Sequence, residues 1–228
     1  MRILVIDIGG THVKVLATGH RKLVEIPSGP KMTPAKMVAA VRVATSSWKY
    51  DAISIGYPGA VVHGRPFTEP HNLGSGWVRF NFKKAFARPV KIINDAAMQA
   101  LGSYRGGRML FLGLGTGLGS AMIVENVLEP LELAHLPYQK GRSYEGYVGQ
   151  AGLERLGKEK WRHHVKEVVK QLKAGLQADY VVLGGGNARL LKRLPPGTRL
   201  GNNANAFQGG YRLWTKRYSG LNHDRFVH

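Results

Sequence analysis

The chain has 228 residues, of which 43% are hydrophobic and 21% charged, so a sizeable buried core is expected and disorder is excluded as the default. It contains no cysteine, which excludes disulfides, thiolate metal sites and cysteine nucleophiles. Lys and Arg number 33 against 14 Asp and Glu; the net charge of +19 favours a polyanionic partner, although a basic bias that serves solubility explains it equally well.

The hydrophobic segments are too short to span a membrane. No apolar run approaches the ~20 residues that a transmembrane helix needs. The N-terminal segment MRILVIDIGG has a strand pattern and shows no signal-peptide cleavage site. We therefore expect a cytoplasmic protein without a membrane partner.

Short apolar runs in the first half predict strands joined by glycine-rich turns. The first run ends in the sequence DIGGT (residues 7–11) and a second strand follows at once, which predicts a hairpin. Pro34 suits the first turn of a helix that extends to about Ser46. The predicted strands are residues 3–8, 13–17, 23–26, 52–56 and 90–93, and a helix is predicted over 96–104.

The same order of elements occurs again in the second half. Strand 109–114 ends in Gly115-Thr116-Gly117, and strand 120–124 follows. The later predicted elements are helices 146–156 and 158–174, strand 180–183, a helix from the triple glycine 184–186 to Leu194, and a helix 204–217. This repetition predicts a duplicated α/β fold with lobes 1–95 and 96–203, helix 204–217 packing back on the first lobe, and a ligand cleft between the lobes.

Each glycine-threonine turn is a candidate phosphate site. Glycines let backbone amides approach a phosphate, and the Thr11 hydroxyl adds a donor. Asp7, at the end of its strand, can hold Mg²⁺ directly or through water. Around Gly115 the glycine spacing is not that of a dinucleotide-binding loop. The alternative for both segments is an ordinary hairpin turn.

Several polar side chains are candidates for sugar chemistry. Asn94-Asp95 ends an apolar strand, so Asp95 can act as a general base, although a helix N-cap explains the pair as well. Glu132 and His135, three residues apart, can bond vicinal hydroxyls or lie on the surface by chance. In the segment that follows Asn72, Trp77 can pack on a sugar face, although such segments are also simply loops.

Together these segments resemble the ROK family of sugar kinases, and within it the polyphosphate glucokinase branch. The matching motifs occur in the family's order across nearly the whole chain: DIGGTHVK, IGYPGAV, NLGSGW, INDAAMQALG, LGLGTGLGSAMI, ELAH and VVLGGGNARLL. The resemblance implies an actin-like (ribonuclease H-like) fold of two lobes, with the active site between them. It also implies a homodimer, for which the sequence shows no interface signature.

The resemblance assigns a role to each candidate by matching position. Asp95 would be the base that deprotonates the 6-hydroxyl of the sugar. The implied sugar-binding residues are Asn72, Asn94, Glu132, His135 and Glu145. The implied phosphate-donor residues are Asp7, Gly9, Gly10, Thr11, Lys14, Gly115, Thr116 and Gly117, and Gly184, Gly185 and Gly186 match the segment that meets adenosine in ATP-using members. The implied cofactor is Mg²⁺, held by Asp7.

The chain departs from the family pattern at three places. Many members carry a cysteine-rich zinc site beside the sugar, and this chain has no cysteine, so no zinc is expected. Ala134 stands where glycine is usual, which would shift His135. The segment 143–147 around Glu145 matches only loosely.

The residues leave the phosphate donor open. Helical spacing within 158–174 places four cations near one face, which favours polyphosphate, although a solvated helix face is the better explanation when the helix is considered alone; these cations are Arg162, Lys166, Lys170 and Lys173. The intact triple glycine favours ATP, and one enzyme can use both. Our first hypothesis is a glucokinase that uses polyphosphate, ATP or both. The alternatives are an ATP-only kinase of another hexose and a non-catalytic sugar- or polyanion-binding protein; nucleic acid is not an expected partner.

Overall fold

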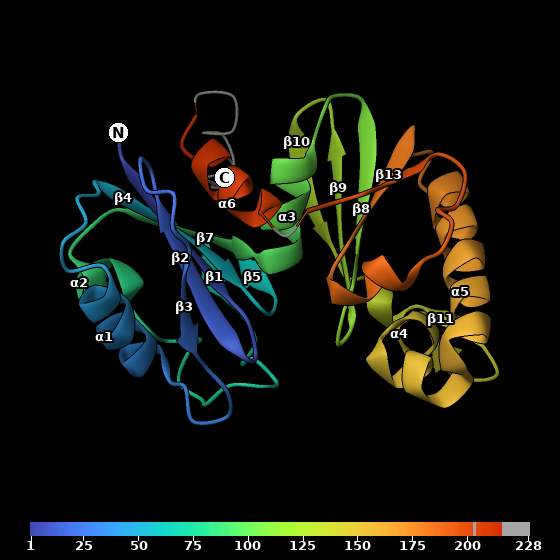
Figure 1. Ribbon diagram of the computed structural model, residues 1–228, viewed down its shortest axis with the longest axis horizontal. Coiled ribbons are helices and arrows are strands. Elements are labelled where there is room, and N and C mark those ends of the chain that lie inside the picture. Colours follow the sequence, from blue (N-terminus) through green and yellow to red (C-terminus); the bar gives the residue numbers. More distant parts are fainter. Residues whose placement is uncertain (203, 216–228) are drawn as a thin grey trace, which may run out of the picture. The chain divides into compact units, whose positions relative to one another are not determined.

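The protein consists of two compact units, which we describe separately. The computed structural model describes residues 1–202 and 204–215 (Figure 1). The first unit contains residues 1–98 and the segment that starts at Ala206, and the second contains residues 99–205. Within the described residues, no helix is long and apolar enough to cross a membrane.

The first unit is built on a five-stranded mixed sheet with the order β3-β2-β1-β4-β7. The strands are β1 (Ile3–Ile8), β2 (His12–Ala17), β3 (Val24–Pro27), β4 (Ala52–Tyr57) and β7 (Val90–Asn94). β1, β2 and β3 form an antiparallel meander, whereas β1, β4 and β7 run parallel. The carboxyl ends of these three parallel strands therefore meet at one edge of the sheet.

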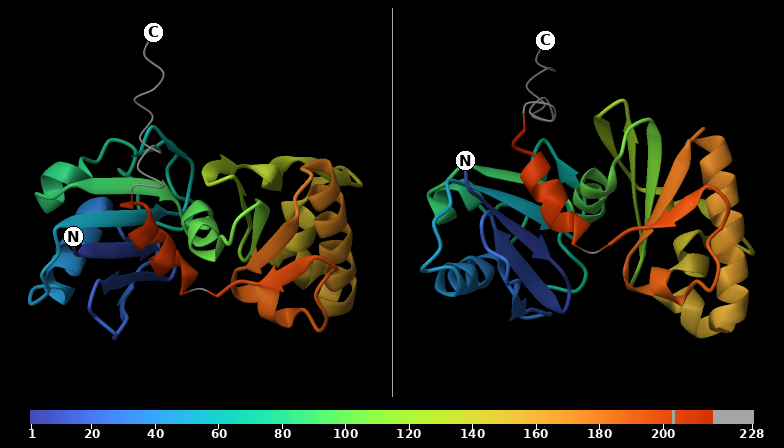
Figure 2. Two further views of the ribbon diagram at one scale, coloured as in Figure 1. Left: turned by 90° about the horizontal axis from the view of Figure 1, so that it is seen from above. Right: turned by 45° about the horizontal axis from the view of Figure 1, so that its top comes forward.

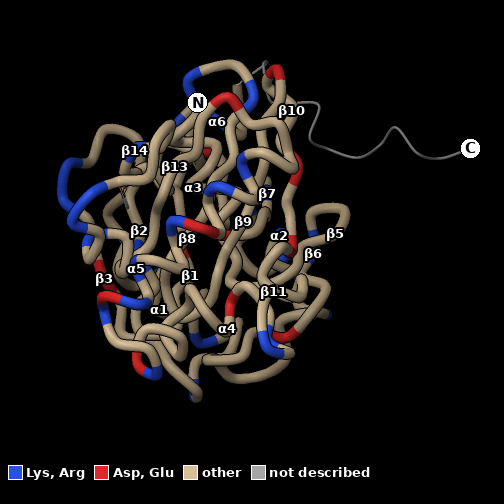
Figure 3. Tube along the Cα trace, turned by 90° about the vertical axis from the view of Figure 1, so that its right-hand side faces the viewer, with Lys and Arg blue, Asp and Glu red and all other residues tan. Residues whose placement is uncertain are grey.

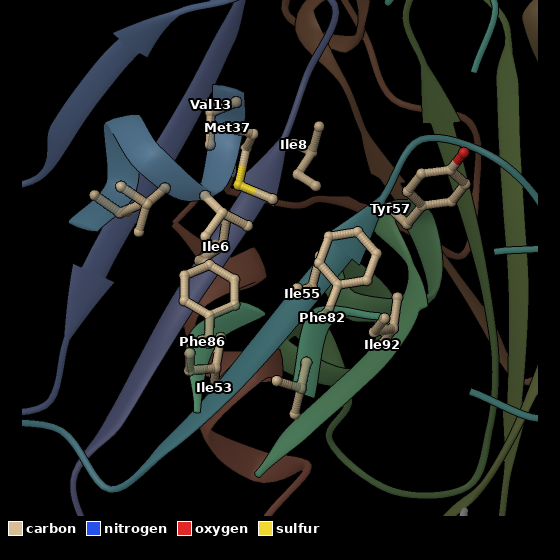
Figure 4. Packing of buried hydrophobic residues seen from close by; sticks show 14 of the residues in the cluster. Ile6, Ile8, Val13, Met37, Ile53, Ile55, Tyr57, Phe82, Phe86 and Ile92 are labelled. Carbon is tan, nitrogen blue, oxygen red and sulfur yellow. The ribbon is translucent and has the colours of Figure 1, made fainter. Parts of the chain in front are cut away.

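One face of this sheet is covered by two helices, α1 (Pro34–Ala44) and α2 (Phe82–Phe86). Thr33 caps α1, because its side chain accepts the Lys36 N–H at 3.4 Å, and Pro34 occupies the first turn as predicted. Met37 of α1 and Phe86 of α2 pack on a shared cluster with the sheet (Figure 4). Burial of alternate strand residues, such as Ile6 and Ile55, supplies the apolar area that stabilises this unit.

The opposite face of the sheet is covered by the start of α3 (Asp95–Ser103) and by α6 (Asn205–Arg212). Val5 and Met98 form a cluster there with Phe207 of α6. The predicted helix 204–217 is shorter than expected at both ends, and residues 216 and 217 lie outside the described part of the chain.

The second unit repeats the sheet of the first. Its order is β10-β9-β8-β13-β14, again three antiparallel strands followed by two parallel ones. The strands are β8 (Arg108–Leu114), β9 (Leu118–Val124), β10 (Val127–Leu131), β13 (Tyr180–Gly184) and β14 (Thr198–Leu200). Since the two hairpins β1–β2 and β8–β9 occupy the same place in each sheet, the predicted duplicated α/β fold is confirmed.

A long helix covers one face of the second sheet. α5 (Gln150–Gly175) follows the short α4 (Glu145–Val148), and it packs Trp161 and Val165 against Leu112 of β8 (Figure 2). Gly157 interrupts α5 with φ 72° and ψ 162°, so the predicted separate helix from Lys158 matches the part after this kink.

The short elements were predicted less well. The predicted helix from the triple glycine to Leu194 is wrong, because only a 3₁₀ helix, η2 (Gly186–Leu190), forms there. The edge strands β10 and β14 and the helix α2 were not predicted. Further short elements are β5 (Val61–Val62), β6 (Arg65–Pro66), η1 (Leu133–His135), β11 (Pro137–Gln139) and β12 (Arg142–Ser143).

A buried serine joins α6 to the sheet and provides a test of this packing. The Ser54 hydroxyl donates to the Gly210 carbonyl at 2.6 Å and accepts the Trp214 indole N–H at 2.9 Å. We expect Ser54→Ala to lower the free energy of unfolding by about 1–3 kcal/mol, because both partners lose a buried hydrogen bond. Denaturant unfolding measures this, and exposed Ser47→Ala should change stability by less than about 0.5 kcal/mol. Equal stability of the two variants would contradict this account.

Candidate active site

The candidate residues of the first unit lie at the carboxyl edge of its sheet. Asp7 near the end of β1 pairs with Gly56 of β4, and Gly56 pairs with Ile93 of β7. Asn94 ends β7 and Asp95 begins α3. The parallel pairing thus brings Asp7 and the Asn94-Asp95 pair to one edge of one sheet.

Asp7 lies in a tight space on the α3 side of this sheet. Its Oδ1 atom lies 3.4 Å from the point where a Cβ on Gly56 would stand, and Met98 of α3 lies against the same point. Because Met98 is three residues after Asp95, both lie on the same side of α3. The first turn of α3 therefore brings Asp95 to the neighbourhood of Asp7.

Burial raises the pKa of the Asp7 carboxyl from 3.8 to about 6, although the charge of Lys14 opposes this shift. Lys14 lies opposite Asp7 in the β1–β2 pairing. The same ammonium group is 3.7 Å from the carboxylate of Glu25 on β3, so its charge is shared between two acids.

Asn94 caps α3, which is the structural alternative considered for the Asn94-Asp95 pair. Its Oδ1 accepts the Ala97 N–H at 3.1 Å, and its Nδ2 donates to the Gly59 carbonyl at 3.1 Å. Asp95 is partly exposed, and its Oδ1 accepts the Ala96 N–H at 2.7 Å. These bonds fix the carboxylate at the end of the strand, and Asn94 keeps lone-pair and N–H capacity for a further partner.

The first glycine-threonine turn, residues 9–11, is held from two sides. The Gly9 N–H donates to the His12 carbonyl at 3.0 Å, and the Ser28 hydroxyl donates to the Gly9 carbonyl at 2.6 Å. Asn72 packs directly on the turn, because its Cβ is 3.0 Å from where a Cβ on Gly10 would stand. Asn72, predicted to bind the sugar, and the turn 9–11, predicted to bind phosphate, are therefore neighbours in this unit.

Trp77 does not have the role considered for it. Its side chain is fully buried in the core of the first unit, and its indole N–H donates to the Gly74 carbonyl at 2.6 Å. The Glu69 carboxylate accepts the N–H groups of Trp77 and Val78 at 3.1 and 3.2 Å. Trp77 thus anchors the loop that carries Asn72 and cannot stack on a sugar.

The second unit has its own group of candidate residues, which surrounds the turn Gly115-Thr116-Gly117. The Glu145 carboxylate accepts the Leu118 N–H at 3.0 Å and occupies the space that a side chain at residue 117 would need. A side chain at residue 117 would therefore have to displace the Glu145 carboxylate from the turn. The geometry therefore makes Glu145, predicted as a sugar-binding residue, a support of this turn as well.

The triple glycine lies beside the same turn. Gly184 ends β13, which pairs with β8 through Gly113, and Gly185 has φ 81° and packs closely on the backbone of Leu114. The Asn187 amide donates to the Gly115 carbonyl at 3.3 Å and to Gln150 Oε1 at 2.9 Å.

The site analysis from sequence missed Asn187 and Gln150. For Asn187 the sequence did contain a signal of a site residue, because its amide side chain directly follows the three glycines. Gln150 had no comparable signal, because its link to the turn depends on tertiary packing alone.

Glu132 and His135 are both exposed and lie at the two ends of η1. Ser120 of β9 fixes this segment: its hydroxyl donates to the Leu131 carbonyl at 2.8 Å and accepts the Leu133 N–H at 3.2 Å. Ala134 between them is buried in the core of the second unit. Glu132 and His135, whose side chains can bond hydroxyl groups, thus lie on a segment that Ser120 and Ala134 hold in place.

The residues of the first unit suit a magnesium ion that would take its other ligands from a bound substrate. No group of three or more His, Asp or Glu side chains in residues 1–202 and 204–215 is arranged to bind a metal. Mg²⁺, however, commonly takes one or two protein carboxylates and completes its shell with phosphate oxygens and water. Asp7, beside the turn 9–11, is the carboxylate that fits this requirement.

The relatives found by sequence comparison are polyphosphate glucokinases, the branch that the sequence motifs resemble. The chain is 28% identical to a polyphosphate glucokinase of Mycobacterium tuberculosis over 216 residues, which cover 84% of this chain and 80% of the relative. It is 26% identical to a polyphosphate glucokinase of Mycobacterium leprae, with 84% of this chain and 65% of the relative covered. No family model matches the chain.

Solved structures share the fold. An inorganic polyphosphate/ATP-glucomannokinase from Arthrobacter sp. strain KM superposes with a TM-score of 0.77 at 24% identity, covering 91% of this chain and 96% of that one. A ROK family glucokinase from Streptomyces griseus gives 0.70 at 16% identity, covering 92% and 97%. The predicted fold class and the resemblance to ROK family sugar kinases are confirmed.

The raised pKa of Asp7 predicts how stability depends on pH. Between pH 4 and pH 6 the folded carboxyl keeps a proton that the unfolded one loses, so stability should fall as pH rises through this range. The shift from 3.8 to about 6 corresponds to about 3 kcal/mol. Asp7→Asn should remove this decline in urea unfolding measured from pH 4 to 7.

Asp51 provides a matched control. A hydrogen bond from the Arg2 backbone N–H lowers the pKa of this exposed acid, so its contribution has the opposite sign. Asp51→Asn should therefore leave the decline between pH 4 and pH 6 in place. A decline that survives Asp7→Asn would contradict the assignment.

Proposed function

We propose that this chain, similar in sequence to polyphosphate glucokinases and with the fold of ROK family sugar kinases, is a hexose kinase. It transfers a phosphoryl group from polyphosphate, ATP or both to the 6-hydroxyl of a hexose, with glucose as the first candidate. The observation that carries the proposal is the meeting of Asp7, the turn 9–11 and Asp95 at one sheet edge in such a chain. Its predicted homodimer stays a prediction.

Asp95 is the proposed general base. The sugar 6-hydroxyl oxygen forms a bond to the terminal phosphorus of the donor, and the bond from that phosphorus to the rest of the donor breaks. The hydroxyl proton passes to the Asp95 carboxylate late in the transfer. The Ala96 N–H, 2.7 Å from Oδ1, and the cap made by Asn94 hold that carboxylate in one orientation.

The remaining residues bind and orient the reactants. We propose that Asn72, Asn94, Glu132, His135 and Glu145 bond the sugar hydroxyls, and that the two glycine-threonine turns hold donor phosphates through their amides. Lys14 adds a positive charge beside the first turn. Mg²⁺, when bound through Asp7, would neutralise charge on the phosphate oxygens.

The second unit carries a basic face that suits a polymeric donor. We define this basic face by seven residues: Arg162, Lys166, Lys170 and Lys173 of α5, and Arg189, Lys192 and Arg193 in and after η2. Figure 3 colours Lys and Arg blue along the trace. The Arg162 guanidinium donates to the Leu190 carbonyl at 2.7 Å, and Lys173 lies against Gly197, so α5 adjoins the segment with the other three cations.

Lys166 and Lys170 are the exposed members of the α5 row, whereas Arg162 is partly occupied by its bond to Leu190. Exposed cations in a row raise the local concentration of a long polyanion.

The two alternative functions require different residues. An ATP-only kinase of another hexose would not use the basic face, and a non-catalytic binding protein would not need Asp95.

A matrix of donors and sugars tests the function directly. Long-chain polyphosphate and ATP are each assayed with glucose, mannose, N-acetylmannosamine and fructose, and the sugar phosphate is quantified. We expect turnover with glucose and at least one donor. Transfer from ATP alone to another sugar would establish the first alternative, and binding without transfer to any sugar would establish the second.

Asp95→Asn tests the proposed base. We expect kcat to fall by about 10²–10⁴ while the Kd for glucose, measured by calorimetry, stays within about threefold, because only proton transfer is lost. Asp51→Asn is a matched change on an exposed Asp that should leave kcat unchanged. Full activity of Asp95→Asn would show that another group accepts the proton.

Charge reversal on the basic face tests the donor. Lys166→Glu/Lys170→Glu should raise the KM for polyphosphate at low salt and flatten its salt dependence, with little effect on the KM for ATP. Lys83→Glu/Lys84→Glu on α2 makes the same change in net charge at exposed positions of the first unit. If both double variants respond alike, net charge rather than the basic face attracts the polymer.

A further inference from the structure

Two of the proposed sugar-binding residues stand at the two ends of one small hairpin in the second unit. His135 ends η1, the strands β11 and β12 follow, and Glu145 begins α4. The hairpin closes on itself through the pair Pro137–Ser143 and through the Tyr144 N–H, which donates to the Leu136 carbonyl at 3.0 Å. A shift of this hairpin would therefore move His135 and Glu145 together.

The hairpin is too short to hold its own position. β11 has three residues and β12 has two, and an isolated two-stranded hairpin is marginally stable in water. Leu136, Gln139 and Lys140 are exposed, so little apolar area on the hairpin itself is buried. Its position must come from contacts with another element.

Those contacts are aromatic and polar, and they come from α4 and α5. The Tyr138 hydroxyl lies 3.2 Å from His164 Nδ1, and the Tyr144 hydroxyl donates to Gln171 Oε1 at 3.3 Å. The rings of Tyr138 and Tyr147 meet edge to face at 5.0 Å between centroids, and those of Tyr147 and His164 at 4.5 Å. Edge-to-face pairs of this kind add to the stabilisation that burial gives.

α5 is a firm support for this cluster. Trp161, Val165 and Val168, which flank His164 along the helix, are buried against the second sheet. The Trp161 indole N–H donates to the Val148 carbonyl at 2.9 Å and so ties α5 to the end of α4. The His164 ring is thus carried by a helix that cannot shift without opening the core.

We propose that Tyr138 and His164 are positioning residues, which clamp the β11–β12 hairpin to α5 and thereby set the distance and orientation of His135 and Glu145 for the sugar. This inference rests on the proposed function, because it concerns the same sugar-binding residues. It adds a residue pair outside every motif that carried the family resemblance. Neither side chain touches the reacting atoms.

The charge state of His164 makes this clamp sensitive to pH. The groups that face its ring are Tyr138 of the hairpin, Tyr147 of α4, and His163, Arg155 and Glu167 of α5. Burial lowers the pKa of His164, and the charges of His163 and Arg155 lower it further against the opposite effect of Glu167. The ring is therefore neutral at pH 7, where Nδ1 can accept the Tyr138 hydroxyl proton.

Protonation of His164 places a hydrogen on Nδ1, so the bond can persist only if the Tyr138 hydroxyl turns to accept that hydrogen. The geometry of the clamp should therefore change as pH falls below the lowered pKa of this histidine. The KM for glucose should rise in that range, and this rise should be absent from a variant that lacks the Tyr138 hydroxyl.

Tyr138→Phe is the first test, because it removes one hydroxyl and keeps the ring. We expect the KM for glucose at pH 7 to rise roughly three- to tenfold, with the KM for the phosphate donor unchanged. Tyr180→Phe is the matched control in the same unit, since its hydroxyl accepts the Arg105 N–H at 3.1 Å and donates to the Gly106 carbonyl at 3.2 Å, away from the hairpin. An unchanged KM for glucose in Tyr138→Phe, or an equal rise in Tyr180→Phe, would overturn the proposal.

His164 variants and hydrogen exchange separate positioning from general loss of stability. His164→Gln keeps an acceptor and should retain most of the glucose affinity, whereas His164→Leu should behave like Tyr138→Phe. Amide exchange over residues 137–144 should accelerate in Tyr138→Phe and not in Tyr180→Phe. Equal exchange in both variants would also overturn the clamp.

The wild-type assay keeps the two proposals apart. Absence of phosphoryl transfer to every sugar in the matrix would overturn the proposed function and the positioning role that rests on it. Normal wild-type turnover combined with an unaffected Tyr138→Phe would overturn the positioning role alone.

Discussion

The parallel pairing of β1, β4 and β7 is the constraint on which the candidate residues of the first unit depend. Parallel strands end at one edge, so Asp7 and the Asn94-Asp95 pair are neighbours in space although almost ninety positions separate them in the chain. The close approach at Gly56 then lets Met98 and the Asp7 carboxyl share the space above β4. A side chain at residue 56 would have to displace the end of the Met98 side chain from this space.

The second unit uses the same topology but supports its turn with different chemistry. In the first unit a serine hydroxyl and the side chain of Asn72 hold the turn 9–11. In the second, the Glu145 carboxylate and the Asn187 amide hold the turn 115–117. Oε2 of Glu145 accepts the Leu118 N–H. Only the remaining lone pairs of that carboxylate can accept hydrogen bonds from another partner. Glu145 thus connects the turn 115–117 to the β11–β12 segment, which begins after His135.

Local patterns predicted the elements whose signals lie in consecutive residues. The hairpins around residues 9–11 and 115–117, the buried strands β4, β7 and β13, the start of α1 at Pro34 and the break before Lys158 were all visible in this way. The edge strands β10 and β14 were missed because half of their residues face solvent and their apolar alternation is weak. Trp77 was misread because burial depends on what packs around a loop, and a pattern such as NLGSGW carries no information about that. The bonds of Asn187, Gln150 and Glu145 join residues 27 to 72 positions apart and have no local signal.

The environment of Asp7 is costly for the fold, and this cost is an argument for function. A carboxyl whose pKa is raised to about 6 destabilises the folded state at neutral pH, and an amide or a small apolar residue would avoid the penalty. Lys14 does not cancel it, because the same ammonium group also pairs with Glu25. A purely structural turn would not need an acid there, since the turn itself is held by Ser28 and Asn72. A cation bound during turnover would reverse the penalty, because it favours the ionised carboxylate that burial disfavours. The energetic disadvantage of the buried Asp7 carboxyl is therefore what a magnesium-dependent phosphate site in this position is expected to show.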